Sequence, residues 1–406
     1  MVIMNEILCY MKLLLALIPW PLYGFVTVCS VISIYFSRRN LNRPVPSLIA
    51  DECPDVSIIK PLMGVDRLLE TNLETYFLLT YPKYEILFCV QDEQDPVIDM
   101  CHRLMARFPI IDCKLFIGGK SSVINPMVQN MSVGYENAQY GLIWISSSRI
   151  KATQNSLQDM VIKIRNPNVA IVHQIPFTSD QKGVANTVEK LSFGGSLARY
   201  YIALNRVGLY CLTGMSYLMK KDELDALGGL TRFGKYLAED HFLSKALYDK
   251  GFTLQLSDIP AQQNVSGTSI VAYKDRMVRW SRLRLAIMPF VASLLEPLID
   301  SITLGLYMSW STYHFFSFDP YIFFVCHIGV WVILDYTLVG GIQNGAFAFS
   351  KSEFLVAWLI REVLQILIHF EALVDARKIK WGKRTYKMKL GGDTEVISEK
   401  LPLQYV

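Results

Sequence analysis

The chain has 406 residues, of which 52% are hydrophobic and 19% charged, and its formal net charge is +4 at pH 7. It is too apolar for an ordinary soluble enzyme, yet it is long enough for one soluble domain beside several membrane helices. The small positive charge and the absence of a basic groove with stacking aromatic residues argue against nucleic acid and favour a membrane surface.

Residues 13–35 are almost entirely apolar and uncharged, and Arg38, Arg39 and Arg43 follow them closely. The run is long enough to cross a hydrocarbon layer of about 30 Å, and the arginines are expected on the cytosolic side. A cleaved signal peptide is the competing interpretation, which the length of the run and the lack of a small-residue cleavage site disfavour. We therefore predict a transmembrane anchor over residues 1–43.

Residues 44–282 have the pattern of a soluble α/β domain. Short apolar runs alternate with stretches of helical spacing, such as residues 97–108 and 156–164, which is typical of a mostly parallel sheet covered by helices on both faces. Ligands of such sheets bind beyond the carboxyl ends of the strands. The predicted strands are residues 56–59, 85–91, 114–117, 142–145 and 169–173.

A second apolar region covers residues 283–376. Its first part, residues 283–299, carries two prolines and a glutamate and is predicted to form an interfacial or re-entrant helix. Three further runs are predicted to cross the membrane, which are residues 301–318, 320–339 and 354–374.

Residues 377–406 are predicted to be a basic tail, with seven Lys and Arg residues between positions 377 and 389. The positive-inside rule places such a tail in the cytosol, whereas an outside N-terminus and three C-terminal crossings place it on the other side. Two alternatives reconcile these statements. Either residues 283–299 also cross the membrane, or one of the later segments does not.

Acidic residues lie at two places where a ligand site is expected. Asp92 directly follows the predicted strand 85–91, and its alternative role is to cap the next helix. Glu239 and Asp240 open a helical stretch, which an ordinary solvated helix start would also explain.

Two arginines precede the second apolar region. Arg276 and Arg279 are three residues apart, so a helix places both guanidinium groups on one face. Their forked donors suit a diphosphate leaving group, and the neighbouring Trp280 could form the wall of a sugar or acceptor pocket. The alternative is a positive collar that binds phospholipid headgroups, and the two roles are compatible.

These features resemble the ceramide glucosyltransferases, also called glucosylceramide synthases, which are membrane enzymes of the family-2 type with a GT-A fold. The resemblance covers nearly the whole chain. It implies transfer of glucose from UDP-glucose to the primary hydroxyl of ceramide with inversion, the first step of glucosphingolipid biosynthesis, on the cytosolic face of a Golgi membrane. The runs that carry it are KPLMGVD at 60–66, YPKYE at 81–85, CVQD at 89–92, LFIGGK at 115–120, TGMS at 213–216, AED at 238–240 and RMVRW at 276–280.

The resemblance also implies roles for single residues. Asp240 would be the general base that takes the proton of the ceramide hydroxyl, and Asp92 would hold the uridine diphosphate end of the donor. Arg276 and Arg279 would steady the departing phosphates, with Glu239 beside them in the donor site. A homo-oligomer, or a hetero-oligomer with a paralogue, is compatible with the sequence.

The chain departs from the family pattern around the donor site. Ser147 stands where the family has the aspartate of its second motif, and Arg149 stands where it has a glycine. Met127 replaces the lysine of an Asn-Pro-Lys run, and Leu197 replaces the histidine of a Phe-Gly-x-Ser-His run. A serine brings no negative charge, so we expect weak binding of Mg²⁺ or Mn²⁺ and leave the metal ligands unassigned.

Two hypotheses follow from these departures. In the first, the guanidinium of Arg149 supplies part of the positive charge that a metal normally brings to the diphosphate, which makes the enzyme metal-independent. In the second, the donor site is no longer used, and the chain is a catalytically weak or inactive paralogue that binds lipid or regulates a partner. A multi-span transporter is disfavoured because the polar motifs gather in the soluble domain.

Overall fold

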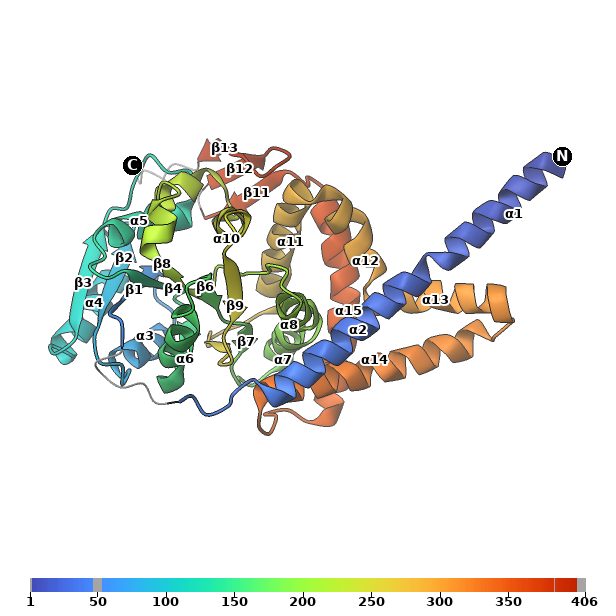
Figure 1. Cartoon of the computed structure of the whole chain (residues 1–406), viewed down its shortest axis with the longest axis horizontal. Helices are drawn as coiled ribbons and strands as arrows, with labels where there is room; N and C mark the ends of the chain where they lie inside the picture. Colours follow the sequence, from blue (N-terminus) through green and yellow to red (C-terminus); the bar gives the residue numbers. More distant parts are fainter. Residues whose placement is uncertain (1, 47–52, 383, 400–406) are drawn as a thin grey trace, which may run out of the picture.

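The computed structural model describes residues 2–46, 53–382 and 384–399. The last part of the predicted basic tail, residues 400–406, lies outside these ranges. A sheet-containing domain and a group of long apolar helices lie side by side (Figure 1).

The central sheet has seven strands in the order β3-β2-β1-β4-β8-β6-β9. It is mostly parallel, as predicted, because only β8 runs antiparallel to its two neighbours. All five strands that the sequence predicts are confirmed. The strands are β1 (Val56–Leu62), β2 (Tyr84–Val90), β3 (Asp112–Ile117), β4 (Leu142–Ser146), β6 (Val169–His173), β8 (Ser216–Lys220) and β9 (Thr253–Leu256).

Helices cover both faces of this sheet. Because side chains alternate along a strand, the neighbours Ile58 and Ile59 of β1 enter two different apolar cores. The first core is closed by α3 (Leu69–Phe77), α4 (Val97–Arg107) and α6 (Gln154–Ile164), and the second by α5 (Pro126–Glu136), the 3-10 segment η3 (Leu230–Lys235) and α10 (Glu239–Asp249).

A second sheet of three short strands, in the order β5-β10-β7, begins next to the carboxyl end of β4. After β7 the chain forms α7, a π-helical segment η2 and α8, which join the domain to the apolar helices. The bounds of these elements are β5 (Ile150–Lys151), β7 (Pro176–Thr178), α7 (Val184–Leu191), η2 (Ser192–Leu197), α8 (Ala198–Arg206), α9 (Lys221–Asp225) and β10 (Ala261–Gln263).

The apolar helices form the other part of the molecule (Figure 1). By length and composition, Glu6–Arg39 and Pro320–Gln343 can each span a membrane, and a bent pair with an angle of 68° adds a third span if it is counted as one. The predicted number of C-terminal crossings and the cytosolic side stay predictions. The helices are α1 (Val2–Leu17), α2 (Pro19–Arg39), α11 (Ile270–Ile287), η4 (Val291–Leu295), α12 (Glu296–Leu298), α13 (Ser301–Phe316), α14 (Pro320–Gln343) and α15 (Lys351–Leu373).

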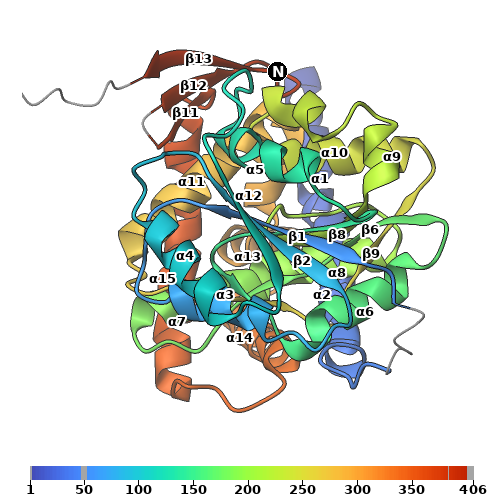
Figure 2. The ribbon, with the colours of Figure 1, turned by 90° about the vertical axis from the view of Figure 1, so that its left-hand side faces the viewer.

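Most of the segment predicted to be a basic tail is folded. It forms an antiparallel sheet of β11 (Lys378–Trp381), β12 (Arg384–Met388) and β13 (Thr394–Glu399). This sheet buries side chains against Leu237, which precedes α10, and Ala286 of α11. Figures 1 and 2 show it beside α10 and α11. The predicted domain boundary between residues 282 and 283 lies inside α11, which is one continuous helix.

Candidate functional site

A short segment before β8 contacts both Ser147, which stands where the family has an aspartate, and Asp240, the candidate general base. Ser147, just past β4, donates its backbone N–H to the carbonyl of Met215 at 2.9 Å. The Asp240 carboxylate, in the first turn of α10, accepts a hydrogen bond of 2.5 Å from the backbone N–H of Gly214. Because Gly214 and Met215 are neighbours, the structure holds Ser147 and Asp240 on one short segment.

The environment of Asp240 makes it suitable as a base. Burial raises the pKa of Asp240 above that of an ordinary aspartate, while hydrogen bonds from the backbone of His241 and Gly214 act in the opposite direction. Burial, and then the charge of Asp240, raise the pKa of the adjacent Glu239 as well. A carboxylate whose pKa is shifted toward the working pH is an effective acceptor of a proton.

Asn125 was missed by the sequence reasoning, although it positions the start of α10. Its side-chain amide donates to the Glu239 carboxylate at 2.6 Å and to the Tyr236 carbonyl at 2.7 Å. Its side-chain oxygen accepts from the backbone N–H groups of Met127 and Val128 and so caps α5. The sequence feature that indicates this capping role is an asparagine directly before a proline at the start of a helix. The Met127 side chain packs against the apolar core on this face of the sheet.

Asp92 lies at the carboxyl end of β2, where a ligand is expected, and it is exposed. Its carboxylate accepts a hydrogen bond of 3.0 Å from the backbone N–H of Gln94. The first residue of α4, Val97, donates instead to Asp95 at 2.9 Å. The alternative role of Asp92 as the cap of this helix is therefore wrong.

A buried lysine, Lys60, lies next to Ser147, which stands where the family has an aspartate. The ammonium of Lys60, on β1, donates to the carbonyl of Ser147 at 2.9 Å and lies 3.4 Å from the hydroxyl of Ser146. It also lies 3.8 Å from the centre of the Tyr76 ring. Burial holds the pKa of Lys60 well below its usual range. This contact could not be predicted from the sequence, because nothing in the KPLMGVD run indicates that its lysine is buried.

The side chains around Ser147 do not fit a divalent cation. In residues 2–46, 53–382 and 384–399, no group of three or more His, Cys, Asp or Glu side chains is arranged to hold a metal ion. Ser147 offers a neutral hydroxyl, and the basic residues Lys60 and Arg149 flank it. Magnesium sites depend on one or two carboxylates besides the substrate phosphates. No catalytic step is therefore assigned to a metal.

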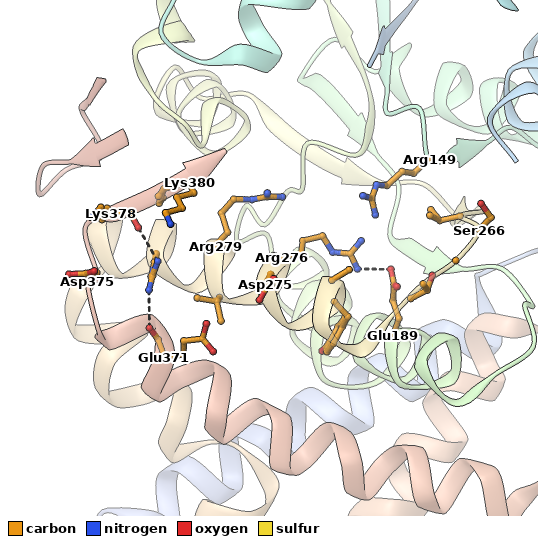
Figure 3. A pocket seen from close by; sticks show the side chains of 18 residues that line it. Arg149, Glu189, Ser266, Asp275, Arg276, Arg279, Glu371, Asp375, Lys378 and Lys380 are labelled. Atoms are coloured by element: carbon orange, nitrogen blue, oxygen red, sulfur yellow. Dashed lines mark hydrogen bonds and ion pairs between the residues drawn. The ribbon is translucent and has the colours of Figure 1, made fainter. Parts of the chain in front are cut away.

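A cavity of about 780 Å³ opens between the loop after β4 and α11 (Figure 3). Arg149 enters it from the loop, and Arg276 and Arg279 enter it from α11. Six basic and four acidic residues line the cavity, so its wall favours an anionic ligand. The other charged residues of the wall are Glu189, Asp275, Arg282, Glu371, Asp375, Lys378 and Lys380.

The two arginines of α11 differ in their partners. Arg276 forms an ion pair of 2.5 Å with Glu189, and the two side chains are only 11% and 4% exposed. Arg279 lies 5.3 Å from the centre of the Trp381 ring and has no ion pair in the part of the chain that the structure describes. Burial, followed by the charge of Arg276, lowers the pKa of both Arg149 and Arg279. An anion between these guanidinium groups would relieve their repulsion.

Two of the predicted features lie away from this cavity. Trp280 packs edge to face against Phe193, with ring centroids 5.9 Å apart, and is not among the residues that line the cavity. Its assignment to a sugar or acceptor pocket stays a prediction. Leu197, which replaces the family histidine, is partly buried in the apolar core formed by α2, α8, α11, α13, α14 and α15.

Comparison with solved structures defines the class of protein. The fold is similar to that of the mannosyltransferase PcManGT from Pyrobaculum calidifontis in complex with GDP-Man and Mn²⁺, with a TM-score of 0.53 and 15% sequence identity. The match covers 89% of this chain and 99% of that chain. The chain therefore has the mixed α/β, GT-A-like fold of a glycosyltransferase, with its central sheet.

Comparison of sequences defines the family. Glycosyl transferase family 21 matches residues 19–394, and the chain belongs to this family. Ceramide glucosyltransferase 3 and ceramide glucosyltransferase 1 of Caenorhabditis elegans are each 35% identical to it. These matches cover 93% and 96% of this chain and 82% and 83% of the relatives. The family resemblance predicted from the motifs is confirmed.

Proposed function

We propose that this chain transfers glucose from UDP-glucose to the primary hydroxyl of ceramide, with inversion at the anomeric carbon, and so makes the first glucosphingolipid. The relatives named ceramide glucosyltransferase support this substrate pair, because they match more than nine-tenths of the chain, at 93% and 96%. The structural observation that carries the proposal is the Asp240 carboxylate, which is held by the Gly214 N–H at 2.5 Å and has a raised pKa.

Asp240 acts as the general base of a single displacement. The ceramide oxygen attacks the anomeric carbon, its proton passes to the Asp240 carboxylate, and the bond from the anomeric carbon to the phosphate oxygen breaks. Attack from the face opposite the leaving UDP inverts the configuration. Proton transfer to a positioned base contributes typically ~10²- to 10⁴-fold to the rate.

Basic side chains receive the charge that develops on the departing UDP. Arg276 and Arg279 project from one face of α11, and Arg149 faces them from the loop after β4. Preorganised donors of this kind stabilise developing charge without a metal. Asp92, at the carboxyl end of β2, holds the uridine end of the donor, and Glu239 supports the site beside Asp240.

The lipid acceptor reaches Asp240 sideways from the bilayer, past residues 283–299. An ion pair of 2.8 Å between Arg284 of α11 and Glu296 of α12 connects the two ends of this segment. We place the catalytic domain on the cytosolic face of the Golgi membrane, where UDP-glucose is available, and the protein acts alone or as a homo- or hetero-oligomer. The catalytically inactive paralogue is the less favoured alternative, given the relatives that the chain matches.

The proposal is tested in cells that lack their own ceramide glucosyltransferase. We expect glucosylceramide in cells that express the chain and none with Asp240→Ala. Asp249→Ala is the matched control, because Asp249 is an exposed carboxylate at the other end of α10 and pairs with Lys245, at 2.5 Å. Absence of product from well-expressed, membrane-inserted protein would refute the proposal.

A further inference from the structure

Two lysines of the C-terminal sheet face the basic cavity. Lys378 and Lys380, on β11, line it, and Figure 3 shows Lys380 beside Arg279. Ile379 lies between them in the chain and is 1% exposed in the core under the sheet. Because side chains alternate along a strand, Lys378 and Lys380 lie on the face opposite the buried Ile379 side chain, although Ile379 also borders the cavity.

Several contacts fix the position of these lysines. Tyr386 and Met388 of β12 pack with Ile379 against the domain. The guanidinium of Arg282 donates to the carbonyl of Lys378 at 3.1 Å, and the backbone N–H of Gly391 donates to a carbonyl of α11 at 3.1 Å. The lysines therefore belong to a sheet docked on α11 and not to a solvated tail.

The positive charge of these lysines is not neutralised by an ion pair in the part of the chain that the structure describes. Among the described residues, neither Lys378 nor Lys380 forms an ion pair, whereas Glu189 of the wall is paired with Arg276. A second acidic residue of the wall, Glu371, is paired with Lys274 outside it at 2.5 Å. The basic groups left without a partner lie on both sides of the cavity, from the loop after β4 to β11.

We propose that Lys378 and Lys380 bind the diphosphate of the nucleotide-sugar donor, so that the C-terminal sheet forms a wall of the donor site opposite Arg149. This inference rests on the proposed function, because the reaction brings a diphosphate to this cavity. Phosphate oxygens of a lipid headgroup share the same chemistry. The donor is favoured because Arg149 lies past the carboxyl end of β4, where ligands of such sheets bind.

The test uses the full-length protein in detergent. We expect the double variant Lys378→Gln/Lys380→Gln to raise the Kd for UDP and the KM for the donor by about tenfold, because hydrogen bonds to charged groups contribute at this level. The kcat should change little, since the lysines hold the donor in the ground state and the transition state alike. The double variant Lys378→Arg/Lys380→Arg keeps the charges and should restore both constants.

Lys387→Gln is the matched control. Lys387 pairs with Lys378 across the two strands, so it lies on the same face of the sheet, but it does not line the cavity. An unchanged Kd and KM in the double Gln variant, or an equal rise in Lys387→Gln, would overturn the inference. The inference would also be overturned if the lysines contribute to the binding of dihexanoyl-phosphatidylserine, a soluble anionic lipid, but not to the binding of UDP.

The two proposals can fail separately. A wild-type protein that binds UDP through the lysines but makes no glucosylceramide refutes the proposed function and supports the inference. A wild-type protein that makes glucosylceramide, with the same donor KM in the double Gln variant, supports the function and refutes the inference.

Discussion

The Asp240 carboxylate and the backbone of Gly214 are in direct contact, with a hydrogen bond of 2.5 Å between them. A Cβ atom added at Gly214 would lie 3.1 Å from Asp240 Oδ2 and 3.3 Å from its Cβ. Such distances are tighter than ordinary van der Waals contact, so any larger residue at position 214 has to displace the carboxylate. The glycine is required by this close approach and not by an unusual backbone conformation.

We therefore expect Gly214→Ala to lower kcat by about 10- to 100-fold, since a small misplacement of a catalytic group costs up to that much. The melting temperature should change little, because only the Asp240 side chain has to move. Gly141→Ala is the control, since a Cβ there meets nothing within 4 Å. A kcat of the wild-type value in Gly214→Ala would show that the position of Asp240 does not limit the reaction.

The pH dependence of the reaction follows from the raised pKa of Asp240. A base acts only when deprotonated, so kcat should fall as the pH is lowered through a pKa that burial has raised above 3.8. Glu239 has a raised pKa too, so its titration could also cause this fall in kcat at low pH, the acid limb of the profile. The variant Glu239→Gln removes that second source. We expect Glu239→Gln to keep the limb in a plot of kcat against pH. Loss of the limb in that variant would assign it to Glu239 instead.

Glu239 also makes stability depend on pH. Its pKa is raised above 4.5 by burial, so the native state binds the proton more tightly than the unfolded state. The stabilisation is fully present below pH 4.5 and is lost as the pH rises, by about 1.4 kcal/mol per pH unit until the native pKa is passed. Glu239→Gln can still accept the hydrogen bond from Asn125 and removes this loss.

The melting temperature of Glu239→Gln should accordingly exceed that of the wild type by more in mildly alkaline buffer than in mildly acidic buffer. Scanning both proteins at the two pH values measures the difference. A variant that is less stable by the same amount at both would mean that Glu239 is charged in the native protein.

The sequence predicted the sheet and the strand-end positions well, because apolar runs determine where buried strands form. Asp92 and Ser147 were expected just beyond two strands, and β2 and β4 end where this requires. The antiparallel strand β8 was not predicted, although it aligns the Gly214 segment with Asp240. The position of β8 between β4 and β6 depends on pairing between segments that are far apart in the chain.

Other parts of the site depended on distant contacts that the sequence does not display. The partner of Arg276 is Glu189, which is 87 positions away in the chain. The sequence predicts a basic tail where the sheet that contributes Lys380 forms, because the many Lys and Arg residues of this segment hide its alternation of polar and apolar residues. The signal was present in the strict alternation of Lys378, Ile379 and Lys380, which is typical of a strand with one buried face.

Arg149 provides a prediction about metal dependence. Its guanidinium lines the basic cavity, and the neighbouring Ser147 lacks the charge that a divalent cation needs. We expect glucosyl transfer to persist in excess EDTA, and Arg149→Ala to weaken UDP binding by about tenfold, as expected when a charge-assisted contact to phosphate is lost. A product assay in excess EDTA measures the first effect, and calorimetry with UDP, with and without magnesium, measures the second.

Arg103→Ala is the control for this experiment, because Arg103 is exposed on α4 and pairs with Glu70 at 3.3 Å, away from the cavity. Ser147→Asp gives the opposite test. A new carboxylate there would lie close to the buried ammonium of Lys60, which already donates to the Ser147 carbonyl at 2.9 Å. If Arg149 supplies the positive charge, this variant should bind magnesium without a gain in kcat. If EDTA abolishes the wild-type reaction, Arg149 does not replace the metal. If only Ser147→Asp makes product, the donor site of the wild-type chain is inactive.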